Sequence, residues 1–145
     1  MKETRDNAPY VRVWRIEDKH GRGAGVTGFA KLHFLAHVRA IQKFDEPEPR
    51  PGTPHVSHVA GADGLSDHVA EHDRFGCTDL QTLRRWFPST AGCQAIDKAG
   101  GLLVAYEAPA DRVKVSDVRA YFDHRHATKV EVLPVTTLNE FSVLT

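Results

Sequence analysis

The chain has 145 residues, with 19 basic and 19 acidic side chains and a formal net charge of zero. A length of this order suits one domain with its own hydrophobic core, so we expect a single domain over residues 1–145. The even balance of charge argues against non-specific nucleic-acid binding, which usually depends on a basic excess.

The first third of the chain predicts a strand and a long helix, separated by a glycine-rich loop. The side chains of residues 10–17 alternate between two faces of an extended chain. The segment also contains Val, Tyr and Trp, which favour strands. Residues 18–28 hold four glycines and predict a loop. Residues 29–44 contain no Gly or Pro and repeat apolar positions at helical spacing, which predicts a helix. The expected apolar stripe of this helix consists of Phe29, Leu32, Ala36 and Ala40.

The middle of the chain predicts a surface loop. Residues 45–58 contain four prolines, each of which lacks an N–H donor and restricts the backbone. We expect this segment to be irregular and to lie on the surface of the domain. A short helix is expected to begin after it, at Ser66, whose hydroxyl would cap the first turn.

A strand, a turn and two short helices follow. Residues 73–78 predict a brief strand that ends in a turn. The next helix is expected over 79–87, with Thr78 or Asp79 as its N-cap. Residues 91–99 predict a second short helix, which the two glycines that come after it would end.

The C-terminal part of the chain predicts further strands. Residues 101–107 form the clearest strand, and their apolar run indicates a central position in a sheet. Short extended pieces are expected over 112–115 and 118–123, and a last strand over 129–135. Pro134 restricts that last strand to an edge or an end of a sheet. Strands at both ends of the chain with helices between them predict an α+β fold.

The sequence also bears on the compartment. Two cysteines, Cys77 and Cys93, are too few for a disulfide framework and are expected to be reduced thiols. No apolar run has the length of a transmembrane helix, and the first ten residues lack the apolar region of a signal peptide. We therefore expect a cytoplasmic protein that makes no contact with a membrane.

Arg15 is the first candidate for a functional residue. It alternates with Val13 and would point inward if that side of the strand faces the core. An inward arginine is costly unless it is paired, so Arg15 either pairs with an acid or binds an anionic ligand. The other interpretation is an exposed arginine on an edge strand. The neighbouring loop, residues 18–28, is either flexible or closes its backbone over a ligand.

The stretch "DRFGCTDLQTLRRWF", residues 73–87, has two interpretations. In the simpler one, Leu80, Leu83 and Phe87 pack an amphipathic helix, and Arg84 and Arg85 are solvated. In the other, this strand, turn and helix border a nucleotide pocket.

The histidines are candidates for metal ligands. A zinc site that includes His68 and His72 is a weaker hypothesis, because the chain shows no standard zinc spacing, and no metal is expected.

Three segments together resemble the ADP-ribosyltransferase fold. They are "VWRIE" in the first strand, "RFGCTDLQTLRRWF", and "GLLVAYEAPADRVKV" over 101–115, and together they cover about a third of the chain. The same layout resembles small phage and actinobacterial proteins. The resemblance implies a small, split and twisted sheet with short helices. It also implies that the protein binds NAD as its substrate. It implies that Arg15 holds the ribose or a phosphate of NAD, that Phe75 or Thr78 borders the nicotinamide, and that Trp86 packs the helix against the site.

Transferases of this fold also need a glutamate on a late strand. If "VRAYFD" is that strand, no glutamate lies on it. If "KVEVLPV" is that strand, Glu131 fits the catalytic position. Either the protein uses Glu131, or it has lost the catalytic acid and only binds a nucleotide.

Two functional hypotheses follow. The first is a domain that binds NAD or a related nucleotide and transfers ADP-ribose. The second is a non-enzymatic phage or prophage protein that acts on a host factor through the loop at 45–58, since structureless loops of such length are often functional.

Overall fold

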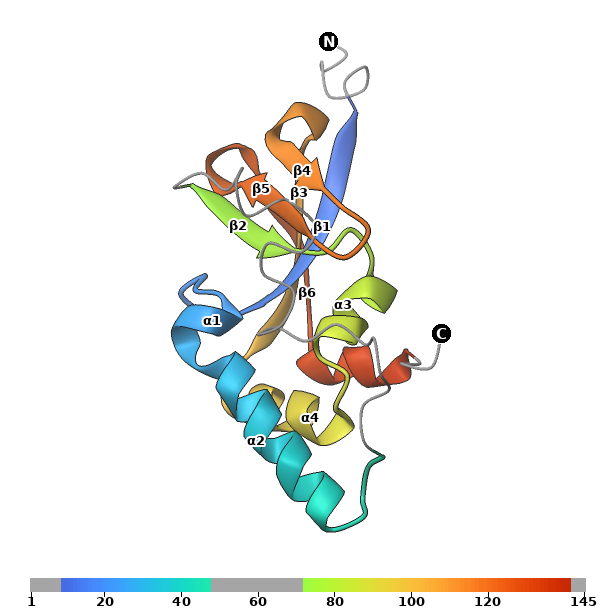
Figure 1. Cartoon of the computed structure of the whole chain (residues 1–145). Helices are drawn as coiled ribbons and strands as arrows, with labels where there is room; N and C mark the ends of the chain where they lie inside the picture. The colour runs from blue at the N-terminus through green and yellow to red at the C-terminus, as the bar shows by residue number, and fades with distance from the viewer. Residues whose placement is uncertain (1–8, 48–71, 142–145) are drawn as a thin grey trace.

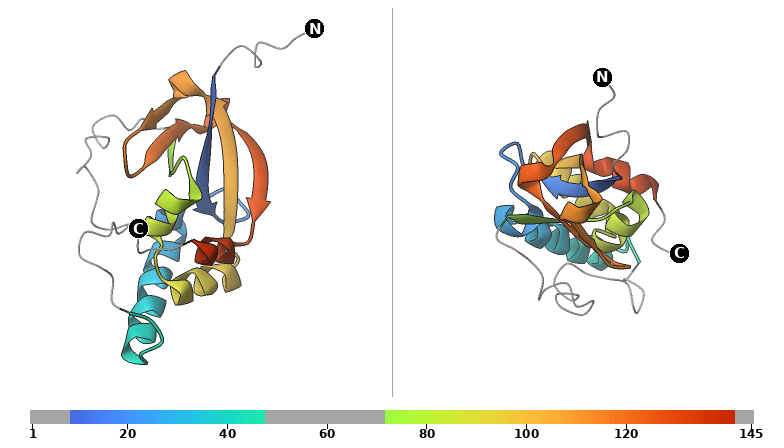
Figure 2. Two further views of the ribbon diagram at one scale, coloured as in Figure 1. Left: turned by 90° about the vertical axis from the view of Figure 1, so that its right-hand side faces the viewer. Right: turned by 90° about the horizontal axis from the view of Figure 1, so that it is seen from above.

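The computed structural model describes residues 9–47 and 72–141, which form two antiparallel sheets and a group of short helices (Figure 1). The first sheet has the strand order β1-β3-β6. It consists of β1 (Tyr10–Glu17), β3 (Leu102–Pro109) and β6 (Thr128–Leu133), which lie side by side in Figure 2. The α+β class is confirmed. The central place of β3 and the edge place of β6 also agree with their sequence patterns.

The second sheet is smaller and packs against one face of the first. It has the order β2-β5-β4, with β2 (Asp73–Gly76), β5 (Ala120–Asp123) and β4 (Val113–Val115). Four fully buried residues from the two sheets fill the space between them, and burial of their apolar area stabilises the contact. They are Val13, Ala108, Ala120 and Phe122.

The two sheets are joined at one point, where β2 meets β1. Trp14 and Cys77 exchange two backbone hydrogen bonds of 2.7 and 2.8 Å. A Cβ atom at Gly76 would lie 2.4 Å from Cγ1 of Val13, so only glycine allows the strands this close. Beyond Trp14 the described residues of β1 form no further bridge to β2. The two strands therefore separate and leave a crevice between the sheets.

The predicted loop over residues 18–28 is wrong in one part, because it contains the short helix α1 (Ala24–Thr27). The backbone N–H groups of Val26 and Thr27 both donate to the carbonyl of Gly23, which closes one helical turn. Gly28 has a φ of 83°, a left-handed conformation that glycine adopts readily, and it separates α1 from the next helix.

Three longer helices pack at one end of the first sheet, against the side that carries Ile16 and Leu103 (Figure 1). They are α2 (Phe29–Gln42), α3 (Leu80–Trp86) and α4 (Thr90–Lys98), close to their predicted bounds. Asp79 caps α3, because its carboxylate accepts a hydrogen bond from the backbone N–H of Thr82. The main core lies between these helices and the sheet. Its fully buried members include Leu83, Phe87, Ile96, Leu103, Val135 and Leu138.

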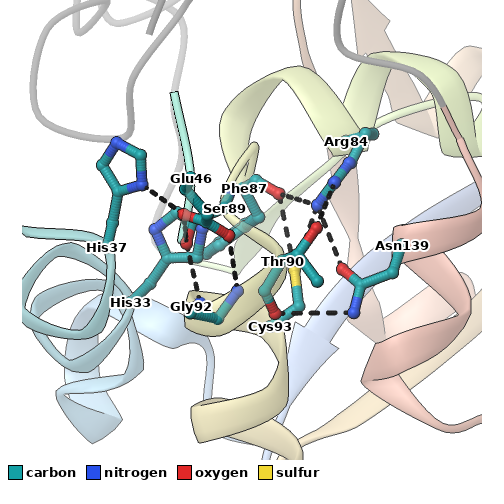
Figure 3. Close-up of polar contacts among 11 residues, drawn as sticks. His33, His37, Glu46, Arg84, Phe87, Ser89, Thr90, Gly92, Cys93 and Asn139 are labelled. Atoms are coloured by element: carbon teal, nitrogen blue, oxygen red, sulfur yellow. Dashed lines mark hydrogen bonds and ion pairs between the residues drawn. The ribbon is translucent and has the colours of Figure 1, made fainter. Parts of the chain in front are cut away.

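The predicted apolar stripe of α2 is confirmed at Phe29 and Ala40, but two histidines occupy the buried positions between them. Its buried residues are Phe29, His33, His37 and Ala40. His33 Nε2 accepts a hydrogen bond from the backbone N–H of Ser89, and His37 Nδ1 lies 2.7 Å from a carboxylate oxygen of Glu46 (Figure 3). These partners allow the imidazoles to be buried, whereas Phe34 remains 48% exposed.

Arg84 was expected in the solvent and is buried, with an exposed fraction of 5%. Its guanidinium donates to the carbonyls of Phe87 and Phe141 and to the side-chain oxygen of Asn139. Arg85 is half-buried. The simple amphipathic interpretation of α3 therefore holds for its leucines and fails for its first arginine.

Several predictions concern parts of the chain outside the described residues. These are the helix from Ser66, the zinc hypothesis at His68, and the proline-rich loop beyond residue 47. Within the part of the chain that the structure describes, no helix has the length and apolar character needed to cross a membrane.

Candidate functional site

A pocket of about 850 Å³ opens where β1 and β2 separate. One wall is the end of β1 with the glycine loop and α1, which lie close to β2 in Figure 1. The other wall comes from β2, from the end of α3 and from β5 with the residue before it. A concave pocket of this volume suits a small-molecule ligand.

Arg15 lines the pocket and is 3% exposed. Its Nη1 donates a 3.2 Å hydrogen bond to the carbonyl of Phe75, and its Nε lies 3.1 Å from a carboxylate oxygen of Glu17. Burial lowers the pKa of Arg15, and the charge of Glu17 opposes that effect. Arg15 therefore pairs with an acid, as one interpretation predicted, and it also lines a pocket, while its binding of an anionic ligand stays a prediction. The exposed edge-strand alternative is wrong.

The glycine loop is folded against this arginine. The Asp18 carboxylate accepts from the backbone N–H groups of His20 and Arg22 and from the Arg22 side chain, which holds the loop in place. A Cβ atom at Gly23 would lie 2.7 Å from Nη2 of Arg15. The backbone at Gly23 therefore lies directly beside the guanidinium, which agrees with a loop that borders a ligand.

Aromatic side chains form the opposite wall. Phe75 lies between Trp86 and Tyr121, edge-on to each, with ring centroids 5.1 and 6.2 Å apart. The Trp86 indole donates to the carbonyl of Val118, which anchors the ring. Trp86 is buried, whereas Phe75 and Tyr121 are half-buried and present ring surface to the pocket. Such surfaces stack on planar ligand groups.

The described lining of the pocket has an excess of basic side chains. Four of these residues are arginines, and they are Arg15, Arg22, Arg74 and Arg119. Asp73 is the acidic residue among the described lining, and Lys114 pairs with its carboxylate at 2.7 Å. The guanidinium of Arg119 lies over the ring of Tyr121, at 5.2 Å from its centroid. Guanidinium groups bind phosphate and carboxylate through paired hydrogen bonds.

The structure brings three of the five predicted site residues together. Arg15, Phe75 and Trp86 all line the pocket. Thr78 is exposed, comes just before the cap of α3 and is not part of the pocket lining. Glu131 also lies elsewhere.

Glu131 lies on β6, opposite Ala105, on the face of the sheet that carries Trp14 and Arg12. Its side chain is 42% exposed and lies 3.4 Å from Arg12. Arg15 is three residues after Arg12 on the same strand, so it points to the other face. The structure therefore separates Glu131 from the pocket.

Sequence reasoning missed several pocket residues, and some of them left a signal. Arg22 lies inside the glycine loop, and Arg74 lies inside the stretch over 73–87 that was predicted to border a nucleotide pocket. Glu17, which pairs with Arg15 from outside the pocket lining, is two residues after Arg15 and so shares its face of the strand. Tyr121 and Arg119 come from a segment whose pairing with β2 depends on the tertiary fold.

Two other chemistries have less support. Among the described residues, no group of three His, Cys, Asp or Glu side chains lies close enough to hold a metal ion. Cys77 is buried, and burial raises the pKa of its thiol far above the usual range, so it is an unreactive thiol at neutral pH.

The pocket can hold an anionic ligand that also carries a planar group. Arginine side chains and half-buried aromatic rings line it, and the backbone of Gly23 lies close to the guanidinium of Arg15. These features define an α+β protein with a basic, partly aromatic pocket between two small antiparallel sheets.

The chain belongs to the family described as bacteriophage T4 Y00F protein, whose model matches residues 1–136. No curated protein and no solved structure matches the chain. The family confirms the expected likeness to phage proteins. The resemblance to ADP-ribosyltransferases stays a prediction.

Proposed function

We propose that this protein binds a nucleotide with a diphosphate, such as NAD or ADP-ribose, in the pocket between β1 and β2. The observation that carries the proposal is the joint presence of buried Arg15 and half-buried Phe75 in one pocket. An arginine recognises a phosphate, and an aromatic face stacks on a base. A volume of about 850 Å³ is large enough for such a ligand.

The proposal is limited to binding. Transfer of ADP-ribose proceeds through loss of nicotinamide, which leaves a cationic ribose that a carboxylate would stabilise. Glu131 was expected to supply that carboxylate, but it lies on the opposite face of the sheet from Arg15. Asp73 lies in the pocket lining but is already paired with Lys114. The geometry therefore supports nucleotide binding better than it supports catalysis.

The experiment is a titration of the protein with NAD and with ADP-ribose, followed by calorimetry and by thermal unfolding. A ligand at a hundredfold excess over its Kd stabilises the native state by about 2.7 kcal/mol. We expect the unmodified protein to bind at least one of the two ligands, and Arg15→Gln to lose most of that affinity.

Arg12→Gln is the matched control. Arg12 lies on the same strand, is exposed, and pairs with Glu107 and Glu131 on the other face of the sheet. Its substitution removes the same charge and should leave binding unchanged. If neither ligand binds the unmodified protein, or if both variants lose affinity equally, the proposed pocket is wrong.

A further inference from the structure

Glu17 is a fully buried carboxylate directly behind the pocket, with an exposed fraction of 1%. The hydroxyl of Tyr106 donates to its two oxygens at 2.8 and 2.9 Å. Arg15 Nε lies 3.1 Å from one oxygen, and Lys129 Nζ lies 3.1 Å from the other. Two cations from different strands thus share one acid.

Lys129 reaches Glu17 because of a β-bulge. The pairing of β3 with β6 shifts register between Ala105 and Tyr106, so that Glu131 opposes Ala105 and Lys129 opposes Tyr106. Val130 is the extra residue. Side chains alternate along a strand, so an unbroken register would turn Lys129 to the same face as Glu131. The bulge redirects Lys129 to the pocket face, as bulges do beside functional sites.

The arrangement determines how Arg15 is held. The carboxylate of Glu17 lies beside Nε of Arg15, and the carbonyl of Phe75 accepts a hydrogen bond from Nη1. The backbone at Gly23 lies close to Nη2. Because Lys129 shares the carboxylate, the three charged groups keep one formal positive charge in total. If Glu17 paired with Arg15 alone, the pair would have no net charge and would attract an anionic ligand less strongly.

We propose that Glu17 and Lys129 are positioning residues that fix the orientation of Arg15 and preserve its charge for an anionic ligand. Glu17 holds the guanidinium, and Lys129 keeps Glu17 from neutralising it. The inference rests on the proposed function for its ligand, whereas the positioning of Arg15 does not depend on any ligand.

The first test asks whether Glu17→Gln strengthens or weakens the binding of ADP-ribose, measured by calorimetry. Glu17→Gln makes the site more positive by one charge, so charge alone would tighten binding of this anion. If Glu17 positions Arg15, the variant instead binds about tenfold more weakly, because the guanidinium loses the ion pair that fixes its orientation. Binding that is unchanged or tighter in Glu17→Gln would overturn the proposal.

The matched control is Glu107→Gln, which removes a carboxylate from the other face of the same sheet, where it pairs with Arg12 at 2.9 Å. This variant should bind ADP-ribose as the unmodified protein does. Equal losses in Glu17→Gln and Glu107→Gln would count against the proposal, because they would indicate a general effect on the sheet.

Lys129 provides a second variant that preserves the fold, since its side chain is 44% exposed. Lys129→Gln should weaken binding several-fold, and Lys129→Arg should restore it, because the arginine keeps the charge. Failure of Lys129→Arg to restore affinity that Lys129→Gln had lost would overturn the role of the lysine charge.

A measurement without ligand separates this inference from the proposed function. The ¹H–¹⁵N NMR signal of Arg15 Nε reports the environment of its guanidinium directly. We expect Glu17→Gln and Lys129→Gln to shift this signal, and Lys114→Gln, which affects the pair with Asp73, to leave it in place. No binding of ADP-ribose by the unmodified protein would refute the proposed function alone. An Arg15 signal that neither Glu17→Gln nor Lys129→Gln moves would refute the positioning role.

Discussion

Arg15 and Arg84 are both almost completely buried, yet they differ in the kind of partner that surrounds them. Arg84 lies among the ends of α3 and α4 and the C-terminal turn, which is the 3-10 helix Val135–Glu140 with Phe141, and its guanidinium donates to neutral acceptors (Figure 3). Arg15 has a carboxylate behind it and a pocket in front. A buried arginine satisfied on all sides joins elements of the fold, whereas one that also faces a cavity is suited to a ligand.

The surroundings of Arg84 support this structural role. Its Nε donates to the carbonyl of Phe141, its Nη1 to Phe87 and Asn139, and its Nη2 to the hydroxyl of Thr90. These acceptors come from segments that are otherwise separate in the chain. One side chain thus connects the C-terminal end of α3, the start of α4 and the C-terminal turn.

The largest effect on stability is therefore expected at Arg84. Arg84→Met would keep much of the volume but leave several acceptors unpaired, at a cost of about 3 kcal/mol in the free energy of unfolding. Arg15→Met should cost less, about 1–2 kcal/mol, because Glu17 keeps Tyr106 and Lys129 as donors. Urea denaturation of the two variants tests the order.

Arg85→Met is the control for this pair, since Arg85 is the half-buried neighbour of Arg84 on the same helix. It should change the free energy of unfolding by no more than about 0.5 kcal/mol. A larger loss in Arg15→Met than in Arg84→Met would reverse the structural interpretation of the two arginines.

Glu46 joins α2 to the start of α4 and predicts a smaller, pH-dependent effect. Burial disfavours its charged form, but hydrogen bonds from the backbone of Ala91, from Ser89 and from His37 outweigh that effect and hold the pKa of Glu46 below its usual 4.5. A lowered pKa in the folded state means that the unfolded state binds the proton more readily. The resulting stabilisation is complete above pH 4.5 and is lost as the pH falls below that value.

We therefore expect Glu46→Gln to lower stability at pH 7 and to flatten the dependence of stability on pH at the acid end. Urea midpoints from pH 7 down to pH 3 measure both effects. Asp45→Asn is the control, because Asp45 is exposed and directly precedes Glu46. If the acid slope is the same in Glu46→Gln and in the unmodified protein, the carboxylate of Glu46 is not its source.

The smallest effect on stability is expected at the glycine loop, together with a clear effect on binding. In Gly23→Ala the new Cβ atom would displace only the end of the Arg15 side chain, so the free energy of unfolding should fall by less than about 1 kcal/mol. The displaced guanidinium should weaken ADP-ribose binding several-fold. Calorimetry and urea denaturation on the same sample measure the two quantities.

Gly25→Ala provides the comparison within the same loop, because no atom lies within 4 Å of a Cβ atom built at Gly25. It should leave both binding and stability close to those of the unmodified protein. Equal losses of affinity in the two glycine variants would mean that the loop itself matters, and not the orientation of Arg15.

The elements could be predicted because their signals are local. Alternation defined β1, the absence of Gly and Pro defined α2, and Asp79 marked the start of α3. The glycine loop and the stretch over 73–87 were correctly identified as unusual, and both contribute to the pocket.

The roles of individual residues were harder to predict, because a strand or helix pattern says which residues share a face but not what lies opposite. Thr78 and Glu131 were assigned to the site from the resemblance to ADP-ribosyltransferases, and the fold places them outside the pocket lining. His33 and His37 were not expected on the buried stripe of α2, because the Ser89 and Glu46 groups that bind them come from elsewhere.

The sequence by itself determined the α+β class and the order and approximate bounds of most strands and helices, whereas the burial of Arg15 was one of two open alternatives that the fold decided. Only the tertiary structure decided which arginine joins the core and which faces a pocket. The reason is physical: a guanidinium is buried where enough acceptors converge on it, and the acceptors of Arg84 lie as far as 57 residues away. The bulge at Val130 shows the same dependence, because the register that turns Lys129 toward Glu17 exists only once β6 pairs with β3.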